Sequence, residues 1–319
     1  MALEGLFGIV LPVFGFIALG YLLIALRVLP ADRGDALGEF VFMVAVPLLL
    51  FRSLGTLELP DISPWPLWLT YFFGVAVNIV VGIVITERLF KRDARSGVLG
   101  AISTSYSNLV MVGIPVFSKA FGEEGLVVGF LLVAVHLPVM MLVSSILIEI
   151  GEHRDGVAKG PLRLGPAMVR VARSLIKNPL IIAILAGSAF RASGLPLEGV
   201  PRTVINGLSD TAIPLALVSL GMSLHKYGIR GNVGPALALS ALKLGLMPLV
   251  VYLVAVHVAG LPPLATAVVV LGAACPTGVN AYLFAVRFQT GLALSANTIT
   301  LTTVISLLTF SLWLTLFGA

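Results

Sequence analysis

The stretch "SYSNLVMVGIP" (Ser105–Pro115) lies inside a segment that is otherwise apolar enough to cross a membrane. It opens with four polar residues and ends with a glycine two positions before a proline. A proline inside a helix removes a backbone hydrogen bond and clashes with the preceding turn. In lipid, the freed backbone groups must be satisfied by protein or by water in a cavity. The stretch therefore predicts a helix that is interrupted at the depth of the membrane.

The composition around this stretch is that of an integral membrane protein. Of the 319 residues, 58% are hydrophobic and 11% are charged, whereas soluble domains carry roughly 25% charged residues. Nearly charge-free stretches of about 20 residues recur along the chain, which is the length that spans a bilayer. No signal-peptide pattern precedes the first span. The single cysteine, Cys275, excludes an intramolecular disulfide framework and a multi-cysteine metal site.

The fold class predicted from this pattern is an all-α integral membrane protein with ten transmembrane helices. The expected spans are Leu3–Val28, Leu37–Leu54, Pro66–Phe90, Val98–Phe121, Leu126–Ile150, Leu175–Ser193, Arg202–Leu224, Pro235–Ala259, Pro263–Phe288 and Leu292–Phe317.

The basic residues predict how the spans are oriented, because cytoplasmic loops are enriched in Lys and Arg. One set of flanks holds fifteen Lys and Arg residues and the other set holds four. This bias places the 151–174 linker in the cytoplasm and both termini outside it, in a multi-pass protein of a bacterial inner membrane. The formal charge of +5 is thereby explained by topology, and no nucleic-acid partner is expected.

The two halves of the chain carry similar marks. "LPVFGFIALG" and "NPLIIAILAG" place Pro12 and Pro179, and also Gly20 and Gly187, 167 residues apart. Pro47 and Pro214 repeat at the same spacing, and Pro115 and Pro276 repeat at 161. Residues 1–150 and 175–319 are therefore expected to be two five-span repeats. An odd number of spans inverts the second copy, as is common in secondary transporters.

The fourth and ninth expected spans share the interrupted pattern of the opening stretch. The ninth reads "GAACPTGVNAY" around Pro276. Half-helices that start near Pro115 and Pro276 would direct their partly positive N-termini at the membrane midplane, which suits an anion. The candidate substrate-binding residues from this pattern are Asn108, Gly113, Pro115, Pro276, Thr277, Gly278 and Asn280.

Five segments together resemble the auxin efflux carrier family, which includes plant auxin exporters and bacterial permeases for small organic acids. These segments are "FMVAVPLLLF", "SNLVMVGIP", "LIKNPL", "LSDTAIPLALVSLGMSL" and "CPTGVNAYLFAVRF". The resemblance covers nearly the whole chain. It departs from the plant carriers at Leu180, where they have a second asparagine, and in the third span, where Asn78 is the one strongly polar residue.

The resemblance implies a fold akin to the bile acid–sodium symporters. Spans 1, 2, 6 and 7 would form a scaffold, often as a homodimer. Spans 3–5 and 8–10 would form a transport domain in which spans 4 and 9 cross. The family also implies substrate contacts near Val46, Asn108, Val110 and Val279.

Ionisable side chains inside spans are costly and are candidates for function. Asp210 could couple transport to a cation, could bond backbone near Pro214, or could pair with Lys243. Lys243 could also extend its amine to the membrane surface. His136 is expected to be a neutral histidine bonded to a carbonyl, with a proton relay as the alternative.

The function predicted from the sequence is secondary transport of small organic anions, either auxin-like monocarboxylates or dicarboxylates, by alternating access. No cofactor or metal is expected, and the coupling ion, if there is one, would be H⁺ or Na⁺. Alternatives are a sodium-coupled symporter of bile-acid type and a channel or sensor on the same fold. The sequence contains neither a nucleophile elbow nor an HExxH pair, so an enzyme is not expected.

Overall fold

The computed structural model describes residues 6–56, 63–158, 165, 168–169, 172–173, 176–229, 231 and 233–318. Throughout these residues the regular elements are helices, and the one β-type contact is an isolated bridge between Ser107 and Thr277. The all-helical class predicted from the sequence is therefore confirmed. Part of the predicted cytoplasmic linker lies outside the described residues.

Nineteen helical elements follow one another along the described chain, five of them short π-helical turns (η). They are η1 (Leu6–Val10), α2 (Leu11–Ala25), α3 (Arg33–Phe40), η2 (Val41–Ala45), α4 (Val46–Thr56), α5 (Pro64–Val84), η3 (Ile85–Leu89), α6 (Ala94–Ser105), η4 (Leu109–Gly113), α7 (Ile114–Arg154), α9 (Pro179–Ala192), α10 (Gly199–Asp210), α11 (Ala212–Tyr227), α12 (Gly234–Ala241), η5 (Leu242–Leu246), α13 (Met247–His257), α14 (Pro263–Ala274), α15 (Asn280–Phe288) and α16 (Leu292–Phe317).

Proline positions explain four of the π-helical turns. Each of η1, η2, η4 and η5 is followed at once by an α-helix whose second residue is a proline. These prolines are Pro12, Pro47, Pro115 and Pro248. A proline has no N–H to give to the preceding turn, and its ring clashes with the carbonyl four residues earlier. A wider π turn separates these groups, so the helix continues through the proline instead of ending there.

Among the described residues, seven helical segments are long and apolar enough to cross a membrane. Two further apolar helices, α9 and α14, are shorter. The expected fourth and fifth spans lie partly in one continuous segment, Leu109–Arg154. Gly122 leaves helical geometry within it (φ 62°, ψ −147°), so a bend falls where the sequence predicted a boundary. The segment continues to Arg154, four residues beyond the predicted end of the first repeat.

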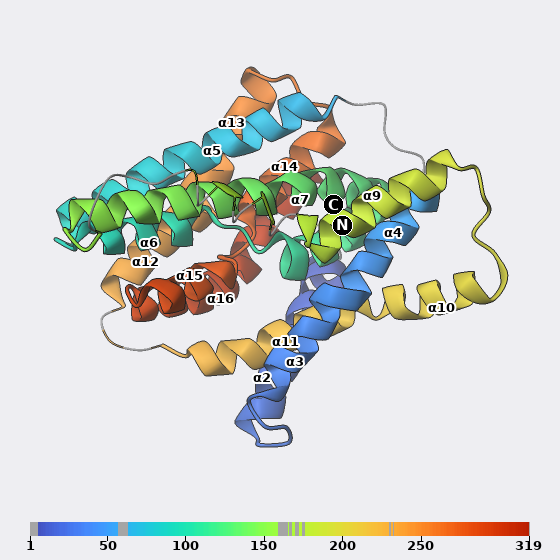
Figure 1. Cartoon of the computed structure of the whole chain (residues 1–319), viewed down its shortest axis with the longest axis horizontal. Coiled ribbons are helices and arrows are strands. Elements are labelled where there is room, and N and C mark those ends of the chain that lie inside the picture. Colours follow the sequence, from blue (N-terminus) through green and yellow to red (C-terminus); the bar gives the residue numbers. More distant parts are fainter. Residues whose placement is uncertain are drawn as a thin grey trace.

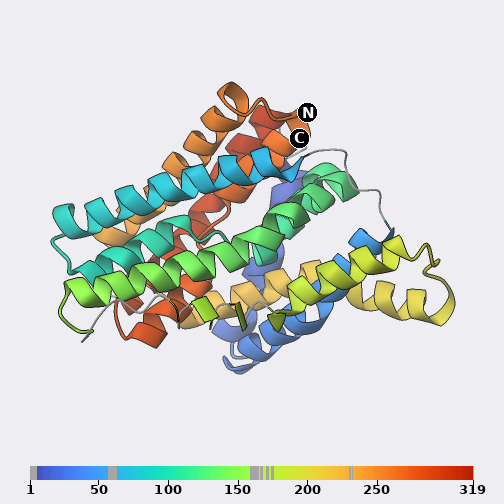
Figure 2. The same ribbon diagram turned by 45° about the horizontal axis from the view of Figure 1, so that its top comes forward.

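The helices pack in two groups (Figure 1). In the first group α2 and α3 pack on α11, and α4 packs on α9 and α10. In the second group α5 packs on α6 and α13, while α14 packs on α7, α13 and α16. The groups meet where η4 and α16 contact α11, and where α7 contacts α4 and α9. Figure 2 shows the second group from another side, with α5 lying along α6 and α7.

Glycines allow the closest contacts inside the first group. A Cβ atom on Gly20 of α2 would collide with the backbone oxygen of Val218, and one on Gly221 of α11 would collide with that of Ile17. A Cβ atom on Gly187 of α9 would lie 2.9 Å from the backbone oxygen of Phe51 in α4, which is a less severe but still close contact. Small residues let helix backbones approach in this way when both helices lie in lipid. The glycines that mark the sequence repeat are therefore packing positions.

Carboxylates hold the start of α6 against the end of α7. Asp155 accepts hydrogen bonds of 2.9 Å from the backbone N–H groups of Ala94 and Arg95, and Asp93 accepts one of 3.0 Å from Ser96. Burial alone would raise the pKa of Asp93, but the bond from Ser96 and the Arg95 charge hold this pKa below its ordinary value. Acidic groups at a helix N-terminus satisfy its free N–H groups and its positive dipole.

Candidate functional site

Two interrupted helices cross at the centre of the second group. α6 ends at Ser105 and the chain resumes as a helix at Leu109, while α14 ends at Ala274 and the chain resumes at Asn280. The extended segments between them pair antiparallel. Asn108 N donates to Pro276 O at 2.9 Å, and Gly278 N donates to Tyr106 O at 2.7 Å. These bonds satisfy backbone groups that the interruptions would otherwise leave unpaired.

The first interruption lies earlier than the sequence predicted. The second half-helix begins at Leu109, directly after Asn108, and not near Pro115. Asn108 Oδ1 accepts a hydrogen bond from Met111 N at 3.3 Å and so caps this start. Pro115 lies in the first turn of α7, after the π turn. The side chain that caps the helix therefore sets the position of the break, and the proline is accommodated within the helix.

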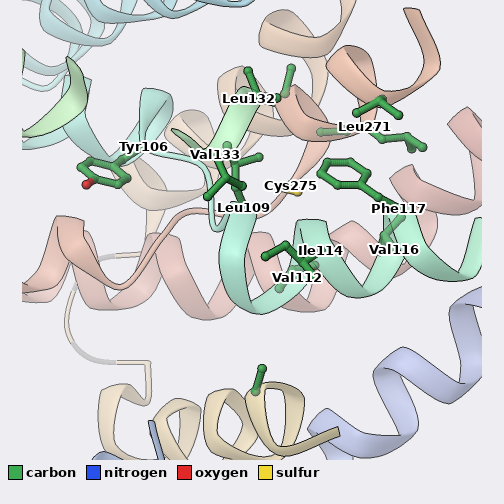
Figure 3. Packing of buried hydrophobic residues seen from close by; sticks show 14 of the residues in the cluster. Tyr106, Leu109, Val112, Ile114, Val116, Phe117, Leu132, Val133, Leu271 and Cys275 are labelled. Carbon is green, nitrogen blue, oxygen red and sulfur yellow. The ribbon is translucent and has the colours of Figure 1, made fainter. Parts of the chain in front are cut away.

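Apolar side chains pack tightly around the crossing. Figure 3 shows Cys275 among side chains from η4, α7 and α14, with Phe117 and Leu271 close together. Gly113 and Gly129 both lie against the Phe117 ring. Cys275 is a buried free thiol, and such a thiol packs as a small apolar group.

Two side chains bind the carbonyls at the C-terminal ends of the first half-helices. Asn78 of α5 donates from Nδ2 to Thr104 O of α6 at 2.8 Å. Lys243 of η5 donates from Nζ to Ala273 O of α14 at 2.5 Å. These carbonyls belong to the last turns of their helices, where no N–H group of the same helix is placed to donate to them. An amide and an amine thus occupy equivalent places at the two interruptions.

Lys243 is fully buried and its contacts match a protonated amine. Besides Ala273 O, it donates to Ser107 Oγ at 2.9 Å and approaches Met247 Sδ at 3.4 Å. Three acceptors thus face the three N–H bonds of an ammonium group. No salt bridge involves Lys243 within the described part of the chain.

A cavity of about 440 Å³ opens beside the crossing, between the two groups of helices. Its inner wall comes from both extended segments and the helix starts that follow them, together with α7. Its other wall comes from α3, η2 and α11, and Asp35 and Lys226 form an exposed ion pair of 2.7 Å there. The lining residues are Gly34, Asp35, Gly38, Phe42, Tyr106, Ser107, Asn108, Leu109, Val110, Met111, Val133, His136, Leu137, Ser219, Ser223, Lys226, Tyr227, Gly278, Val279, Asn280, Tyr282 and Leu283.

Three buried polar atoms of cavity-lining residues have no hydrogen-bond partner among the described residues, namely Tyr106 Oη, Asn108 Nδ2 and His136 Nε2. The exposed fractions of Asn108 and His136 are 6% and 4%. A buried donor or acceptor without a partner costs roughly 1–3 kcal/mol. The start of α15 also borders the cavity and, unlike η4, is not capped by a side chain. The cavity therefore offers an amide donor and borders a helix N-terminus, at which Ala281 N and Tyr282 N already donate to Gly278 O and Val279 O.

Five of the ten predicted substrate-binding residues line this cavity. They are Asn108, Val110, Gly278, Val279 and Asn280. The other five, Val46, Gly113, Pro115, Pro276 and Thr277, lie outside its lining. Thr277 has a structural contact instead, since its Oγ1 donates to Ser103 O at 2.6 Å. The prolines and Gly113 shape or pack the crossing, and this is why their sequence signal did not mark cavity walls.

The structure does not bring Asp210 and Lys243 together. Asp210 pairs with Arg52 at 2.7 Å, and its side chain is 68% exposed. Lys243 is fully buried, so it does not reach the membrane surface. His136 bonds a hydroxyl, since its Nδ1 lies 3.1 Å from Tyr71 Oη, whereas a carbonyl partner was expected. Of these three, only His136 lines the cavity.

The wall from α3, η2 and α11 was not predicted. Gly38, Phe42, Ser219 and Ser223 face the cavity from segments that carry no helix break. Ser219 and Ser223 are spaced four residues apart, so they lie on one face of α11. This small polar face was the one signal in the sequence that could have indicated the wall.

A cavity beside crossed, interrupted helices, in a chain whose described residues include seven long apolar helical segments, is typical of a multi-pass membrane protein. The family model described as membrane transport protein matches residues 6–314. The chain belongs to this family, the auxin efflux carriers, whose known relatives are transporters and not enzymes.

Relatives of similar length match nearly the whole chain. An uncharacterised transporter of Methanothermobacter thermautotrophicus is 28% identical over 95% of this chain and 96% of its own. A putative malonate transporter of Rhizobium meliloti is 25% identical over 95% and 92%. An uncharacterised transporter of Methanocaldococcus jannaschii is 22% identical over 96% of each.

Proposed function

We propose that this transporter moves small organic anions across the cytoplasmic membrane by alternating access, and that it binds them in the cavity beside the crossing. The observation that carries the proposal is the free Nδ2 of Asn108, buried in the cavity next to the uncapped start of α15. Asn108 Nδ2 can donate to a carboxylate while its Oδ1 keeps the cap on η4. The start of α15 adds a positive dipole end.

The proposed architecture is the predicted pair of inverted five-span repeats. The group of α2, α3, α4, α9, α10 and α11 would act as the scaffold, and the group that contains both interruptions would act as the transport domain. The shared glycine positions and the equivalent contacts of Asn78 and Lys243 support this division. Motion of one group against the other would expose the cavity alternately to the two sides.

The cavity wall with Asp35 and Lys226 lies on the side that the positive-inside count assigns to the cytoplasm. The described conformation would therefore be open inward, with both termini outside. Maleimide labelling tests this orientation. A cysteine at Val157 should react only from the cytoplasmic side, and labelling from outside would reverse the proposed orientation. A homodimer in lipid remains the expected assembly.

The substrate class follows from the cavity. Apolar side chains make up much of the lining, and its free donors suit one carboxylate group with an apolar body. The relative that is described as a putative malonate transporter is consistent with organic acids. Transport in proteoliposomes with and without Na⁺ and pH gradients would separate a uniporter from H⁺ coupling and from the sodium-coupled alternative.

The test removes the Asn108 amide but keeps its cap. In Asn108→Ser the hydroxyl can still accept from Met111 N, whereas the donor to the ligand is lost. A lost bond to a charged group is worth roughly 1.5–3 kcal/mol, so phenylacetate and acetate should bind about 10- to 100-fold more weakly. Asn206→Ala, on α10 outside the cavity lining, is the matched control.

Isothermal titration gives the affinity, and counterflow in proteoliposomes gives transport. Unchanged carboxylate affinity in Asn108→Ser, with wild-type transport, would remove the cavity from the proposed mechanism.

A further inference from the structure

His136 lines the cavity and has one ring nitrogen without a hydrogen-bond partner among the described residues. This nitrogen is Nε2, and the residue is buried on α7. Its other nitrogen, Nδ1, lies 3.1 Å from the hydroxyl of Tyr71 on α5. The ring also packs edge-on against Tyr71 and Tyr106, with ring centroids 5.5 and 5.1 Å apart, so its orientation is fixed.

The hydrogen bonds behind His136 determine which ring nitrogen carries the proton. The Tyr71 hydroxyl donates to Ser107 Oγ at 2.9 Å. A hydroxyl has one hydrogen, so Tyr71 can only accept in its contact with His136. Nδ1 must therefore carry the hydrogen and donate it. In a neutral imidazole the other nitrogen is then an acceptor, so Nε2 carries a lone pair without a partner among the described residues.

The hydrogen bond from Lys243 to Ser107 supports this direction of donation through the series of hydrogen bonds. Lys243 donates to the same Ser107 Oγ at 2.9 Å. Ser107 Oγ thus accepts from both Tyr71 and Lys243, which uses the two acceptor sites of a hydroxyl oxygen. The order Lys243, Ser107, Tyr71, His136 connects the buried amine with the cavity surface.

We infer that the transporter selects carboxylates that also carry a hydrogen-bond donor, and that His136 Nε2 accepts from this donor. The inference rests on the proposed function, since Asn108 would hold the carboxylate. Phe42, Val133, Leu137 and Leu283 provide an apolar surface for the rest of the ligand. A ligand without a donor leaves the buried lone pair unpaired, and sites built for a polar group reject analogues that lack it.

The experiment compares ligands that differ only in the donor. Phenylacetate is the parent compound. Mandelate, 3-hydroxyphenylacetate and 4-hydroxyphenylacetate add a hydroxyl at three positions, and the corresponding methoxy compounds keep each oxygen but lose its hydrogen. Affinities are measured by isothermal titration on the purified full-length protein in detergent or nanodiscs. At least one hydroxy acid should bind about tenfold more tightly than both phenylacetate and its own methoxy partner.

Tyr71→Phe tests the origin of the preference. This variant removes the acceptor that holds the hydrogen on Nδ1, so the imidazole can place it on either nitrogen. The hydroxy preference should fall below about threefold, while phenylacetate still binds. Tyr252→Phe makes the same chemical change on α13, outside the cavity lining, and should keep the preference. His136→Phe keeps a ring but removes the acceptor, so it should lose the preference in the same way and provides a second variant.

The outcomes separate the two proposals. If hydroxy and methoxy acids bind equally well and both bind better than phenylacetate, Nε2 donates and the inference is wrong. The inference also fails if no hydroxy acid is preferred, or if Tyr71→Phe keeps the preference. In these cases carboxylate binding that depends on Asn108 would leave the proposed function intact. If none of the carboxylates binds, both proposals fail.

Discussion

The two interrupted helices have the same geometry but differ in the chemistry at their ends. The carboxylates of Asp93 and Asp155 accept hydrogen bonds from N–H groups at the start of α6, and the neutral amide of Asn78 binds its last turn. α14 begins at prolines without a side-chain cap, and its last turn is bound by the amine of Lys243. The helix after the first break is capped by Asn108, whereas α15 after the second break is not capped by a side chain.

This difference shows how one backbone arrangement can serve two purposes. At the first break, side chains satisfy the backbone on both sides, and one amide group of Asn108 remains free. At the second break, α15 has no side-chain cap, and the amine of Lys243 binds the end of α14. In the proposed function, the first break would contribute the Asn108 amide on a backbone that side chains satisfy, and the second would contribute positive potential for an anion.

The variant with the largest expected effect on this difference between the two breaks is Lys243→Met, which keeps roughly the length of the side chain but removes its charge. At an effective dielectric near 20, a nearby ammonium group stabilises a carboxylate by on the order of 3 kcal/mol. Affinity for phenylacetate should therefore fall about 100-fold in an isothermal titration. The melting temperature should change little, because relief from burying a charge offsets the donor lost at Ala273 O.

Lys243→Gln is the companion variant, since it can still donate to Ala273 O but carries no charge. It should bind as weakly as Lys243→Met. Wild-type affinity in Lys243→Gln would show that Lys243 acts through its hydrogen bonds alone, as Asn78 does, and the proposed difference between the two breaks would disappear.

Asn78→Ala should show the opposite pattern. It removes the donor to Thr104 O at 2.8 Å and a longer bond to Leu242 O at 3.3 Å. Buried carbonyls left without these donors should cost about 2 kcal/mol of folding free energy. The melting temperature should fall while phenylacetate affinity stays within about threefold. Asn206→Ala serves as the control, and an unchanged melting temperature in Asn78→Ala would contradict the structural role.

The sequence predicted the existence of these breaks better than their details. Polar residues followed by glycine and proline inside an apolar span indicate a local interruption, and that pattern located both crossing segments. The sequence did not show whether the second half-helix starts after Asn108 or near Pro115. The π turn η4 removes the steric clash of Pro115 with the preceding turn, so the helix continues through the proline. Composition alone does not show whether a proline breaks a helix or is accommodated by such a turn.

Partners across the fold were the part that the sequence could not supply. Asn78 stood out as the one strongly polar residue of its span, and Lys243 as a charge within a span. Neither pattern names Thr104 or Ala273, which lie 26 and 30 residues away along the chain. The pairing of Asp210 with Arg52 spans 158 residues. Such contacts follow from helix packing and not from local spacing.

A smaller effect is expected at the start of α6. Asp155→Ala removes the acceptor for two backbone N–H groups and the partner of Arg95. Loss of a helix cap costs about 1 kcal/mol, so thermal unfolding should begin a few degrees earlier. Ligand affinity should not change, because the cavity lies at the other end of α6. Glu152→Ala is the matched control in the last turn of α7, and an equal loss of stability in that variant would contradict the capping role.

The smallest effect is expected for the charges that lie away from both breaks. Asp210 and Arg52 join α10 to α4 at 2.7 Å, with side chains that are 68% and 26% exposed. Exposed ion pairs contribute less than about 1 kcal/mol, so Asp210→Asn should leave the melting temperature within about two degrees of wild type. It should also leave substrate uptake, and its dependence on Na⁺ and pH gradients, unchanged in proteoliposomes. A double-mutant cycle with Arg52→Gln would measure the pair directly. If Asp210→Asn instead abolished gradient dependence at constant stability, a coupling group would lie in the proposed scaffold, and the assignment of charge-dependent function to the second break alone would be wrong.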